Sequence, residues 1–181
     1  MSQPLRFSGI MPANLLPFTA DLAIDEVAYR RHLRWLVDTP GVTGIVANGH
    51  ASEVSSLSRE ERKRALAIAV DEVAGACPVV AGVYADGTRE AVELARDARA
   101  AGAAGVLVFP PTLFMWGAQL KPDMVLRHFS EIAPSAPSRN VAMSDIVKAE
   151  SIATGRPVAR SARRFASNVT MSFDQSLTAQ T

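Results

Sequence analysis

Short apolar segments alternate along this chain with longer stretches whose apolar residues recur at helical spacing, and this alternation limits the possible folds most strongly. The apolar segments are residues 9–18, 43–47, 78–83 and 105–109. Each is followed by a helical stretch, and the unit recurs roughly every 30 residues, a length typical of βα construction. Successive βα units place parallel strands in one sheet that helices cover. The predicted fold class is therefore α/β, either an open doubly wound sheet or a (β/α)8 barrel.

The four helical stretches carry recognisable start and stop signals. Residues 25–37 place apolar side chains on one helical face and end before Pro40. Ser58 opens a Ser-Arg-Glu-Glu sequence that fits a capping box, Thr88 is expected to cap the third helix, and Pro122 suits the first turn of the fourth. The buried face of the fourth helix is predicted to consist of Val125, Leu126, Phe129 and Ile132.

The chain changes character after Ala133. Residues 1–133 contain 13 of the 14 leucines, whereas residues 134–181 contain one leucine, eight serines, six Lys/Arg and three Asp/Glu. The segment 134–138 is rich in Pro and Ser, a composition typical of linkers. We therefore predict an organised part over residues 5–133, which is four βα units or half of a barrel. Residues 134–181 form an irregular Ser/Arg-rich tail, for which disorder and an out-of-frame reading are the two hypotheses.

Composition excludes several classes of protein. A single cysteine, Cys77, excludes an intrachain disulfide framework and a multi-cysteine zinc site. The three histidines show no metal-ligand spacing, so neither a metal nor a cofactor is predicted. A formal net charge of +1 gives no reason to expect nucleic acid as a partner. The chain has no apolar run near the roughly 20 residues of a membrane helix and no apolar signal-peptide core, so we expect a cytoplasmic protein without a membrane partner.

Ligands of parallel α/β proteins bind at the carboxyl ends of the strands, which here points to the loops beginning at Asn48, Tyr84 and Pro110. The first of these loops combines an imidazole, a hydroxyl, a carboxylate and several backbone N–H groups in one turn, Gly49, His50, Ala51, Ser52 and Glu53. Such a turn can hold a substrate carboxylate, and His50 can move a proton. The alternative is that these residues only shape a turn.

Two further loops are open to more than one interpretation. Tyr84, Ala85 and Asp86 follow the third apolar segment and either line a pocket or form a plain turn. Residues 112–117 include Leu113, Phe114, Met115 and Trp116, a large apolar load for a loop. Such a loop indicates either the wall of a substrate site or a contact with another subunit, and we favour the contact.

Six segments in a fixed order resemble motifs of one known family. The matching segments are residues 9–18, 49–53, 58–62, 79–83, 88–91 and 101–111. Together they resemble the dihydrodipicolinate synthase / N-acetylneuraminate lyase family of Schiff-base aldolases, which are (β/α)8 barrels. In this alignment residues 49–53 lie on the family's G-T-T-G-E carboxylate-binding turn, and residues 101–111 resemble its "AGADAVLVVPPYY" segment. The resemblance covers roughly residues 5–133.

The resemblance implies a carbon–carbon lyase or hydro-lyase that acts on pyruvate or another 2-oxo acid. In this family a buried lysine on a later strand forms a Schiff base with the oxo acid, and the nitrogen serves as an electron sink. The backbone of the turn binds the substrate carboxylate. The resemblance therefore assigns substrate binding to Gly49, His50, Ala51, Ser52, Glu53 and Thr112. No cofactor is expected. Half a barrel would leave its first and fourth strands as open edges, so we also expect a homo-oligomer.

This chain departs from the family pattern at several positions. His50 and Ala51 occupy the positions of the two threonines of the turn, and Thr112 stands at a tyrosine position. Of the three lysines, Lys63 and Lys121 follow no strand signal, so Lys148 is the candidate nucleophile and His50 its catalytic companion. We predict an impaired enzyme. The first alternative is a non-catalytic fragment or paralogue that folds only by association. The second is a basic tail, Arg156 to Arg164, that binds an anionic partner.

Overall fold

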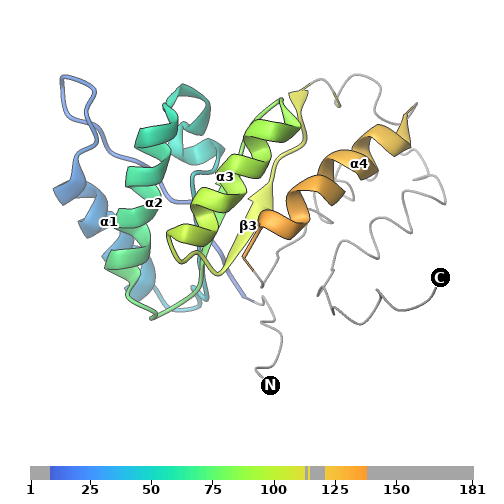
Figure 1. Ribbon diagram of the computed structural model, residues 1–181. Helices are drawn as coiled ribbons and strands as arrows, with labels where there is room; N and C mark the ends of the chain where they lie inside the picture. The colour runs from blue at the N-terminus through green and yellow to red at the C-terminus, as the bar shows by residue number, and fades with distance from the viewer. Residues whose placement is uncertain (1–8, 113, 115–120, 138–181) are drawn as a thin grey trace, which may run out of the picture.

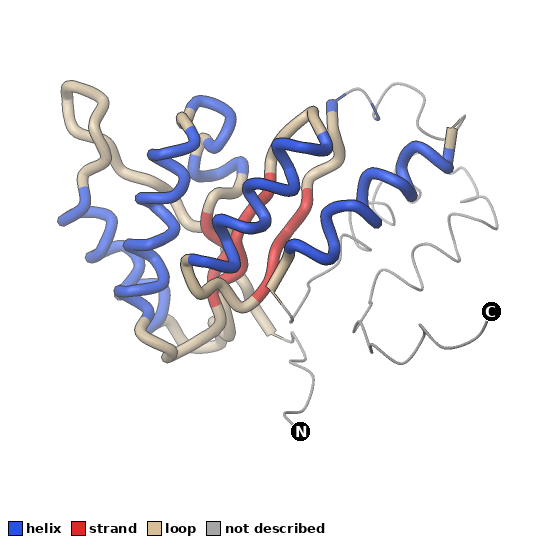
Figure 2. Tube along the Cα trace, viewed as in Figure 1, coloured by secondary structure: helices blue, strands red, loops and turns tan. Residues whose placement is uncertain are grey.

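The computed structural model describes residues 9–112, 114 and 121–137 (Figure 1). Within these residues four helices and three strands alternate (Figures 1 and 2). They are α1 (Glu26–Asp38), β1 (Ile45–Ala47), α2 (Arg59–Val73), β2 (Val79–Val83), α3 (Thr88–Ala100), β3 (Gly105–Val108) and α4 (Pro122–Ile132). Short 3-10 helices follow β1 and α4, namely η1 (His50–Ser52), η2 (Val54–Ser56) and η5 (Ala133–Ser135).

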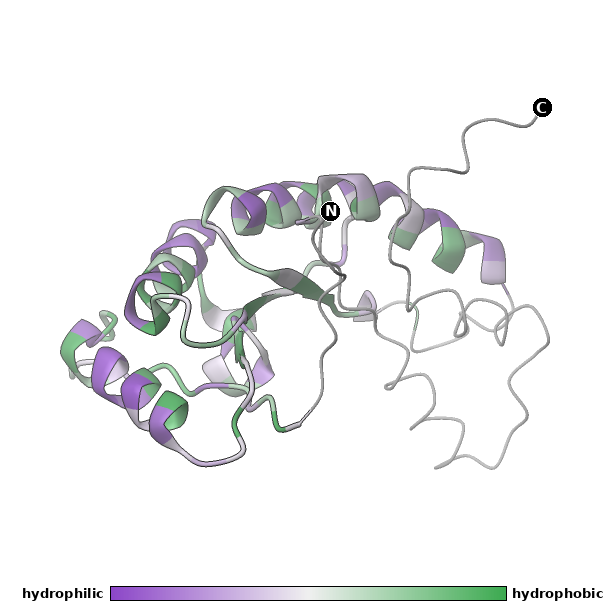
Figure 3. Ribbon diagram, turned by 90° about the horizontal axis from the view of Figure 1, so that it is seen from below, coloured by the Kyte–Doolittle hydropathy of each residue, from purple (hydrophilic) through white to green (hydrophobic). Residues whose placement is uncertain are grey.

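The three strands form one parallel sheet in the order β1-β2-β3. In this register Ala47 pairs with Ala81 and Val83 pairs with Val108, so the carboxyl ends of the strands meet at one edge. The helices follow an arc outside the strands, with hydrophilic residues along their outer faces (Figure 3). The predicted α/β class is confirmed, and the arrangement is that of a partial barrel.

The predicted first strand, within residues 9–18, is present only as isolated pairings. Ile10 pairs in parallel with Val42 and Ala13 with Val46, beside β1. The amide of Val46 donates to the Pro12 carbonyl at 2.9 Å, and the amide of Asn14 donates to the Val46 carbonyl at 3.0 Å. Because Pro12 has no N–H, this segment cannot build a continuous ladder on both edges. The predicted strand therefore lies where it was expected, beside β1. It is not a continuous strand, and it is not fully buried, because Ile10 is exposed.

The core lies between the strands and the helical layer. Strand residues that alternate along β1, β2 and β3 face the helices and are buried, among them Ile45, Ala81 and Val106. From α1 the core receives Tyr29, Leu33 and Leu36, on the face that the helical spacing predicts. From α2 and α3 it receives mainly alanine, leucine and valine.

The predicted capping box at Ser58 is confirmed. The Ser58 hydroxyl accepts a hydrogen bond from the amide of Glu61 at 3.3 Å, and the Glu61 carboxylate accepts one from the Ser58 amide at 2.8 Å. The two bonds satisfy backbone donors that the first turn of a helix leaves without partners.

The prediction that Thr88 caps the third helix is wrong. Gly87 is the N-cap of α3, with no side-chain hydrogen bond, and Thr88 is the first helical residue. The Thr88 hydroxyl pairs instead with Nδ1 of His128 on α4, at 2.8 Å. A tertiary partner far along the chain has taken the hydroxyl that local spacing assigned to a cap.

Helix α4 begins at Pro122, as predicted, but its buried face is only partly the predicted one. Ile132 is buried and Phe129 packs against the core, whereas Leu126 is exposed and His128 is buried. Leu126 and His128 are two positions apart, which places them about 200° apart around the helix, on opposite sides. Because His128 faces α3, Leu126 faces away from it.

The chain beyond α4 continues into packed structure for a few residues. Residues Ala133–Ser135 form η5, and Ala136 is buried within the core cluster. Residues 138–181, which include most of the predicted tail and Lys148, lie outside the described residues. Within the part that is described, no helix has the length and apolar character needed to cross a membrane.

Candidate functional site

Three aromatic rings meet at the carboxyl edge of the sheet. Tyr84 follows β2 directly, Phe109 follows β3 directly, and His50 stands three residues after β1. The His50 ring centroid lies 4.3 Å from that of Phe109 and 5.3 Å from that of Tyr84, and the Tyr84 and Phe109 centroids are 6.2 Å apart. The predicted loops that begin at Asn48 and Tyr84 thus converge, and Phe109, which precedes the predicted loop at Pro110, joins them.

The turn after β1 lies directly over β2. It begins at Asn48 and ends at Glu53, both with positive φ (54° and 55°), and η1 forms between them. A Cβ atom at Gly82 of β2 would stand 2.0 Å from the Asn48 carbonyl oxygen. Only a glycine at position 82 lets the backbone of the turn approach the strand this closely.

A buried polar network supports the turn from below. The Ser52 hydroxyl donates to the Asn14 carbonyl at 3.1 Å, and the Asn14 amide nitrogen donates to the Tyr29 hydroxyl at 3.0 Å. All three residues are buried, and burial raises the pKa of the Tyr29 phenol well above its usual range. The network joins the turn to the first βα unit. It uses the single donor of the Ser52 hydroxyl, and the Ser52 amide donates to the Gly49 carbonyl at 3.0 Å, so Ser52 has no free donor for a carboxylate ligand.

Three of the four remaining predicted residues of the turn face outward. His50, Ala51 and Glu53 are exposed. Gly49 is buried, and a Cβ atom built on it would lie 3.7 Å from the Cβ of Ala13. Within the described residues the Glu53 carboxylate makes no ion pair. The turn therefore presents one imidazole and one carboxylate to solvent at the carboxyl edge, on a backbone that is fixed from beneath.

Arg62 ties the turn to the loop after β2. Its guanidinium donates to the Tyr84 carbonyl at 2.9 Å and to the Leu57 carbonyl at 3.0 Å, and its own carbonyl accepts from the side-chain amide of Asn48 at 2.9 Å. Sequence reasoning did not single out Arg62 as a site residue. Its only sequence signal is its place in the capped helix, because the three partners lie in three different segments.

The loops after β2 and β3 are joined by a hydrogen bond. The Asp86 carboxylate accepts from the backbone N–H of Thr112 at 2.7 Å. Thr112, a predicted substrate-binding residue, is exposed at the same edge as His50. Of the apolar loop that follows, only Phe114 is described, and its ring packs at 5.5 Å on that of His128. The other residues predicted to form a wall or a contact lie outside the described residues.

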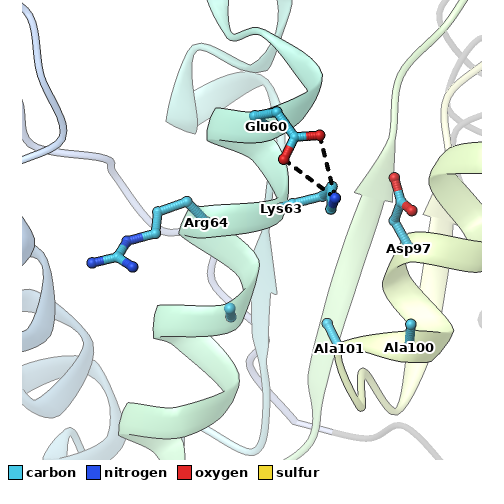
Figure 4. Close-up of a pocket in the computed structure, with 7 residues that line it drawn as sticks. Glu60, Lys63, Arg64, Asp97, Ala100 and Ala101 are labelled. Atoms are coloured by element: carbon cyan, nitrogen blue, oxygen red, sulfur yellow. Dashed lines mark hydrogen bonds and ion pairs between the residues drawn. The ribbon is translucent and has the colours of Figure 1, made fainter.

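Neither described lysine stands in a strand or directly after one. Lys63 lies on the outer side of α2, where it pairs with Glu60 at 3.2 Å and lines a groove between α2 and α3 (Figure 4). Lys121 is exposed at the start of α4. The groove is rimmed by the side chains of both signs seen in Figure 4, including Arg64 and Asp97, and it lies outside the sheet. The candidate nucleophile Lys148 is outside the described residues.

The two other histidines and the cysteine are packing residues. His128 is buried, and burial lowers its pKa. His32 accepts a hydrogen bond from the Leu15 amide at 3.2 Å. The Cys77 thiol is half-buried, which raises its pKa, so it is a poor nucleophile. Within the described residues no group of three or more His, Cys, Asp or Glu side chains could hold a metal ion.

Parallel strands, helices that cover one face of the sheet and loops that meet at the carboxyl edge define an α/β protein of the barrel type. A family model makes the assignment specific. Residues 6–146 match the dihydrodipicolinate synthetase family, and the chain belongs to it. The match continues past Ala133, where the motif-based resemblance ended.

Individual relatives show the same relationship. The 4-hydroxy-tetrahydrodipicolinate synthase of Bartonella quintana is 39% identical over 127 residues, which are 69% of this chain and 41% of that protein. The structure of the corresponding synthase from Methylacidiphilum fumariolicum SolV superposes with a TM-score of 0.66 and 29% identity, over 72% of this chain and 42% of that one. The chain thus spans about two fifths of the length of the relatives it matches.

One structural relative was solved with a small molecule. The chloride-inhibited dihydrodipicolinate synthase from Acinetobacter baumannii, complexed with pyruvate, gives a TM-score of 0.64 at 27% identity. The alignment covers 71% of this chain and 42% of that protein. The predicted family and fold are confirmed by these comparisons.

Proposed function

We propose that the turn of residues 49–53 binds the carboxylate of pyruvate or another 2-oxo acid. The observation that carries this proposal is the position of the turn, at the carboxyl edge of the sheet and held against Gly82 from one side and by Ser52 from below. A carboxylate site needs backbone N–H groups held in a fixed geometry, and the two supports provide that rigidity. The pyruvate in the A. baumannii relative supports a 2-oxo acid as the ligand class.

In the proposed site His50 takes the place of a hydroxyl in proton transfer. The imidazole lies over Phe109 and beside Tyr84, where it faces solvent at the mouth of the site. A neutral imidazole carries one N–H donor and one acceptor nitrogen, so it can pass a proton in either direction. Residues 50 and 51 stand at the two threonine positions of the family's turn. Because Ala51 has no polar side-chain group, His50 supplies the only polar side chain at these two positions.

Schiff-base chemistry requires a lysine amine that can reach the oxo carbon. The amine adds to the carbonyl and water leaves, which gives an iminium ion that withdraws electrons from the adjacent carbon–carbon bond. Neither Lys63 nor Lys121 follows a strand, and Lys148 is the remaining candidate. The proposed function is therefore a 2-oxo-acid lyase of this family that is impaired in the 181-residue chain, and a cytoplasmic location stays a prediction from composition.

A second candidate function is a non-catalytic member of the family that folds by association. The observation that favours it is the exposed apolar surface at the two ends of the helical layer, where Trp35 and Leu126 lie. Such a chain would keep the carboxylate turn without the lysine.

Pyruvate titration followed by NMR, with borohydride trapping read by intact mass, tests both parts. Ala51→Glu places a negative charge in the proposed carboxylate site, and we expect it to weaken pyruvate binding by about tenfold or more. Ala67→Glu is the matched control, because Ala67 is an exposed alanine on the outer side of α2, and it should bind normally. Equal binding by both variants would refute the assignment of the turn.

Trapping separates an impaired enzyme from a working one. We expect no borohydride-stable adduct on this chain, alongside a full-length relative that is trapped under the same conditions. A specific adduct on Lys148 would show a working Schiff-base enzyme and would overturn the proposed impairment. An adduct on Lys63 or Lys121 would contradict the site described above.

A further inference from the structure

The aromatic rings of His50, Tyr84 and Phe109 form one cluster in which each ring packs on both of the others. The ring centroids of the three pairs are 4.3, 5.3 and 6.2 Å apart. Phe109 is buried, Tyr84 is half-buried and His50 is exposed. The cluster therefore has a buried base and an aromatic surface that reaches solvent at the carboxyl edge of the sheet.

The backbone holds two of these rings in fixed positions. Tyr84 and Phe109 are the first residues after the neighbouring strands β2 and β3. The amide of Phe109 donates to the Val83 carbonyl at 3.0 Å, which continues the pairing of the two strands by one residue. The Arg62 guanidinium anchors the Tyr84 carbonyl at 2.9 Å. An aromatic surface on supports of this kind is formed before any ligand arrives.

The aromatic surface lies next to the proposed carboxylate turn. His50 belongs both to this turn, residues 49–53, and to the cluster. The space between the turn and β2 is closed, because even a Cβ atom at Gly82 would lie 2.0 Å from the Asn48 carbonyl oxygen. A substituent of a bound acid cannot pass beneath the turn. Where it extends over the ends of β2 and β3, it meets the rings of Tyr84 and His50.

The charged side chains around this surface are acidic. In residues 48–57, 84–87 and 109–112, and apart from the imidazole of His50, they are the exposed carboxylates Glu53 and Asp86. Arg62 contacts these loops from α2, but its guanidinium already donates to the carbonyls of Leu57 and Tyr84. A second anionic group on the ligand would therefore meet like charges in these loops, whereas a neutral apolar group would not.

We propose that Tyr84 and Phe109, with the ring of His50, determine the substrate class of this chain. They select 2-oxo acids that carry an apolar and above all an aromatic substituent, over acids that carry a second anionic group. An apolar substituent is removed from water against the rings, and an aromatic one adds edge-to-face or offset packing. A second carboxylate loses hydration there without a counter-charge from these loops. This inference rests on the proposed carboxylate turn and adds the ligand's substituent.

Two acids that differ only in their terminal group test the proposal on the 181-residue chain. Both share a 2-oxo acid group and a two-carbon linker, and 2-oxo-4-phenylbutanoate then ends in a phenyl ring and 2-oxoglutarate in a carboxylate. We expect NMR titration to give a dissociation constant for 2-oxoglutarate about tenfold or more above that for 2-oxo-4-phenylbutanoate. Nuclear Overhauser contacts should join the phenyl protons of the ligand to the ring protons of Tyr84.

The ratio of the two dissociation constants is the quantity to compare between variants. Tyr84→Ala and Phe109→Leu should each lower this ratio by about threefold or more, because each removes one ring. Phe109→Leu keeps an apolar side chain at the buried position, and Tyr84→Phe keeps the ring and should keep the ratio. Trp35→Ala is the matched control, since Trp35 is a 63% exposed aromatic residue on α1, outside the three loops, and its loss should leave the ratio unchanged.

The outcomes separate this inference from the proposed function. Pyruvate binding that Ala51→Glu weakens, together with a ratio near one, would overturn the aromatic selection and leave the carboxylate turn standing. A ratio that Tyr84→Ala leaves unchanged, or that Trp35→Ala abolishes, would also overturn the selection. If no pyruvate binding were detected, the carboxylate turn itself would be refuted, and this inference would fall with it.

Discussion

The substitution Gly82→Ala tests the close contact between the turn and the sheet. The added Cβ would lie 2.0 Å from the Asn48 carbonyl oxygen, 2.7 Å from its carbon and 3.2 Å from the Gly49 nitrogen. All three atoms belong to the backbone, so no side-chain rotation can make room. Since ordinary contact begins at 3.4 Å, the turn must retreat by roughly 1.4 Å or the strands must separate.

The expected magnitude follows from overpacking. Inserting a methyl group into a filled site costs about 1–3 kcal/mol, and the lower backbone entropy of alanine in the unfolded chain returns about 0.4–1 kcal/mol. We therefore expect the free energy of unfolding to fall by about 1–2 kcal/mol. Because a displacement of this size also moves the proposed carboxylate site, pyruvate binding should weaken along with stability.

Urea unfolding followed by circular dichroism measures the first effect, and the NMR titration measures the second. Gly49→Ala is the control, because the nearest atoms to its added Cβ lie at 3.7 Å and 3.9 Å and its φ of −87° suits alanine. It should change stability by less than about 0.5 kcal/mol. If Gly82→Ala proved as harmless as Gly49→Ala, the turn would not lie against β2, and the argument for a rigid carboxylate site would fail.

Three further substitutions probe the supports of the fold. Ser58→Ala should lower the free energy of unfolding by about 1 kcal/mol through loss of the capping box, whereas Ser55→Ala should have little effect in the same urea titration. Tyr29→Phe removes an acceptor of the Asn14 amide and should cost about 1–2 kcal/mol, and an unchanged midpoint would contradict the role of the buried network. Because burial lowers the pKa of His128, the unfolded chain binds a proton near pH 6.5 that the folded chain does not. Stability should therefore fall as the pH drops from 7 to 5, and His128→Gln should reduce that slope in unfolding curves recorded at each pH.

The sequence by itself determined the order of the elements and the family. Apolar spacing predicted α1, the Ser-Arg-Glu-Glu sequence predicted the start of α2, and β-branched runs predicted β2 and β3. These signals depend on residues close together in the chain, since helical periodicity, caps and strand propensity act over a few positions. The motif order gave the family, which the family model confirms.

Only the tertiary structure decided which side chains meet. The Thr88 hydroxyl bonds to His128, forty residues away, and the Ser52 hydroxyl points down to Asn14 rather than out to a ligand. Leu126 follows the apolar spacing of α4, yet it is exposed, because His128 rather than Leu126 faces α3. Contacts of this kind depend on how separate βα units pack against one another. Local spacing carries no information about that packing, because each unit can satisfy its own pattern wherever its neighbours lie.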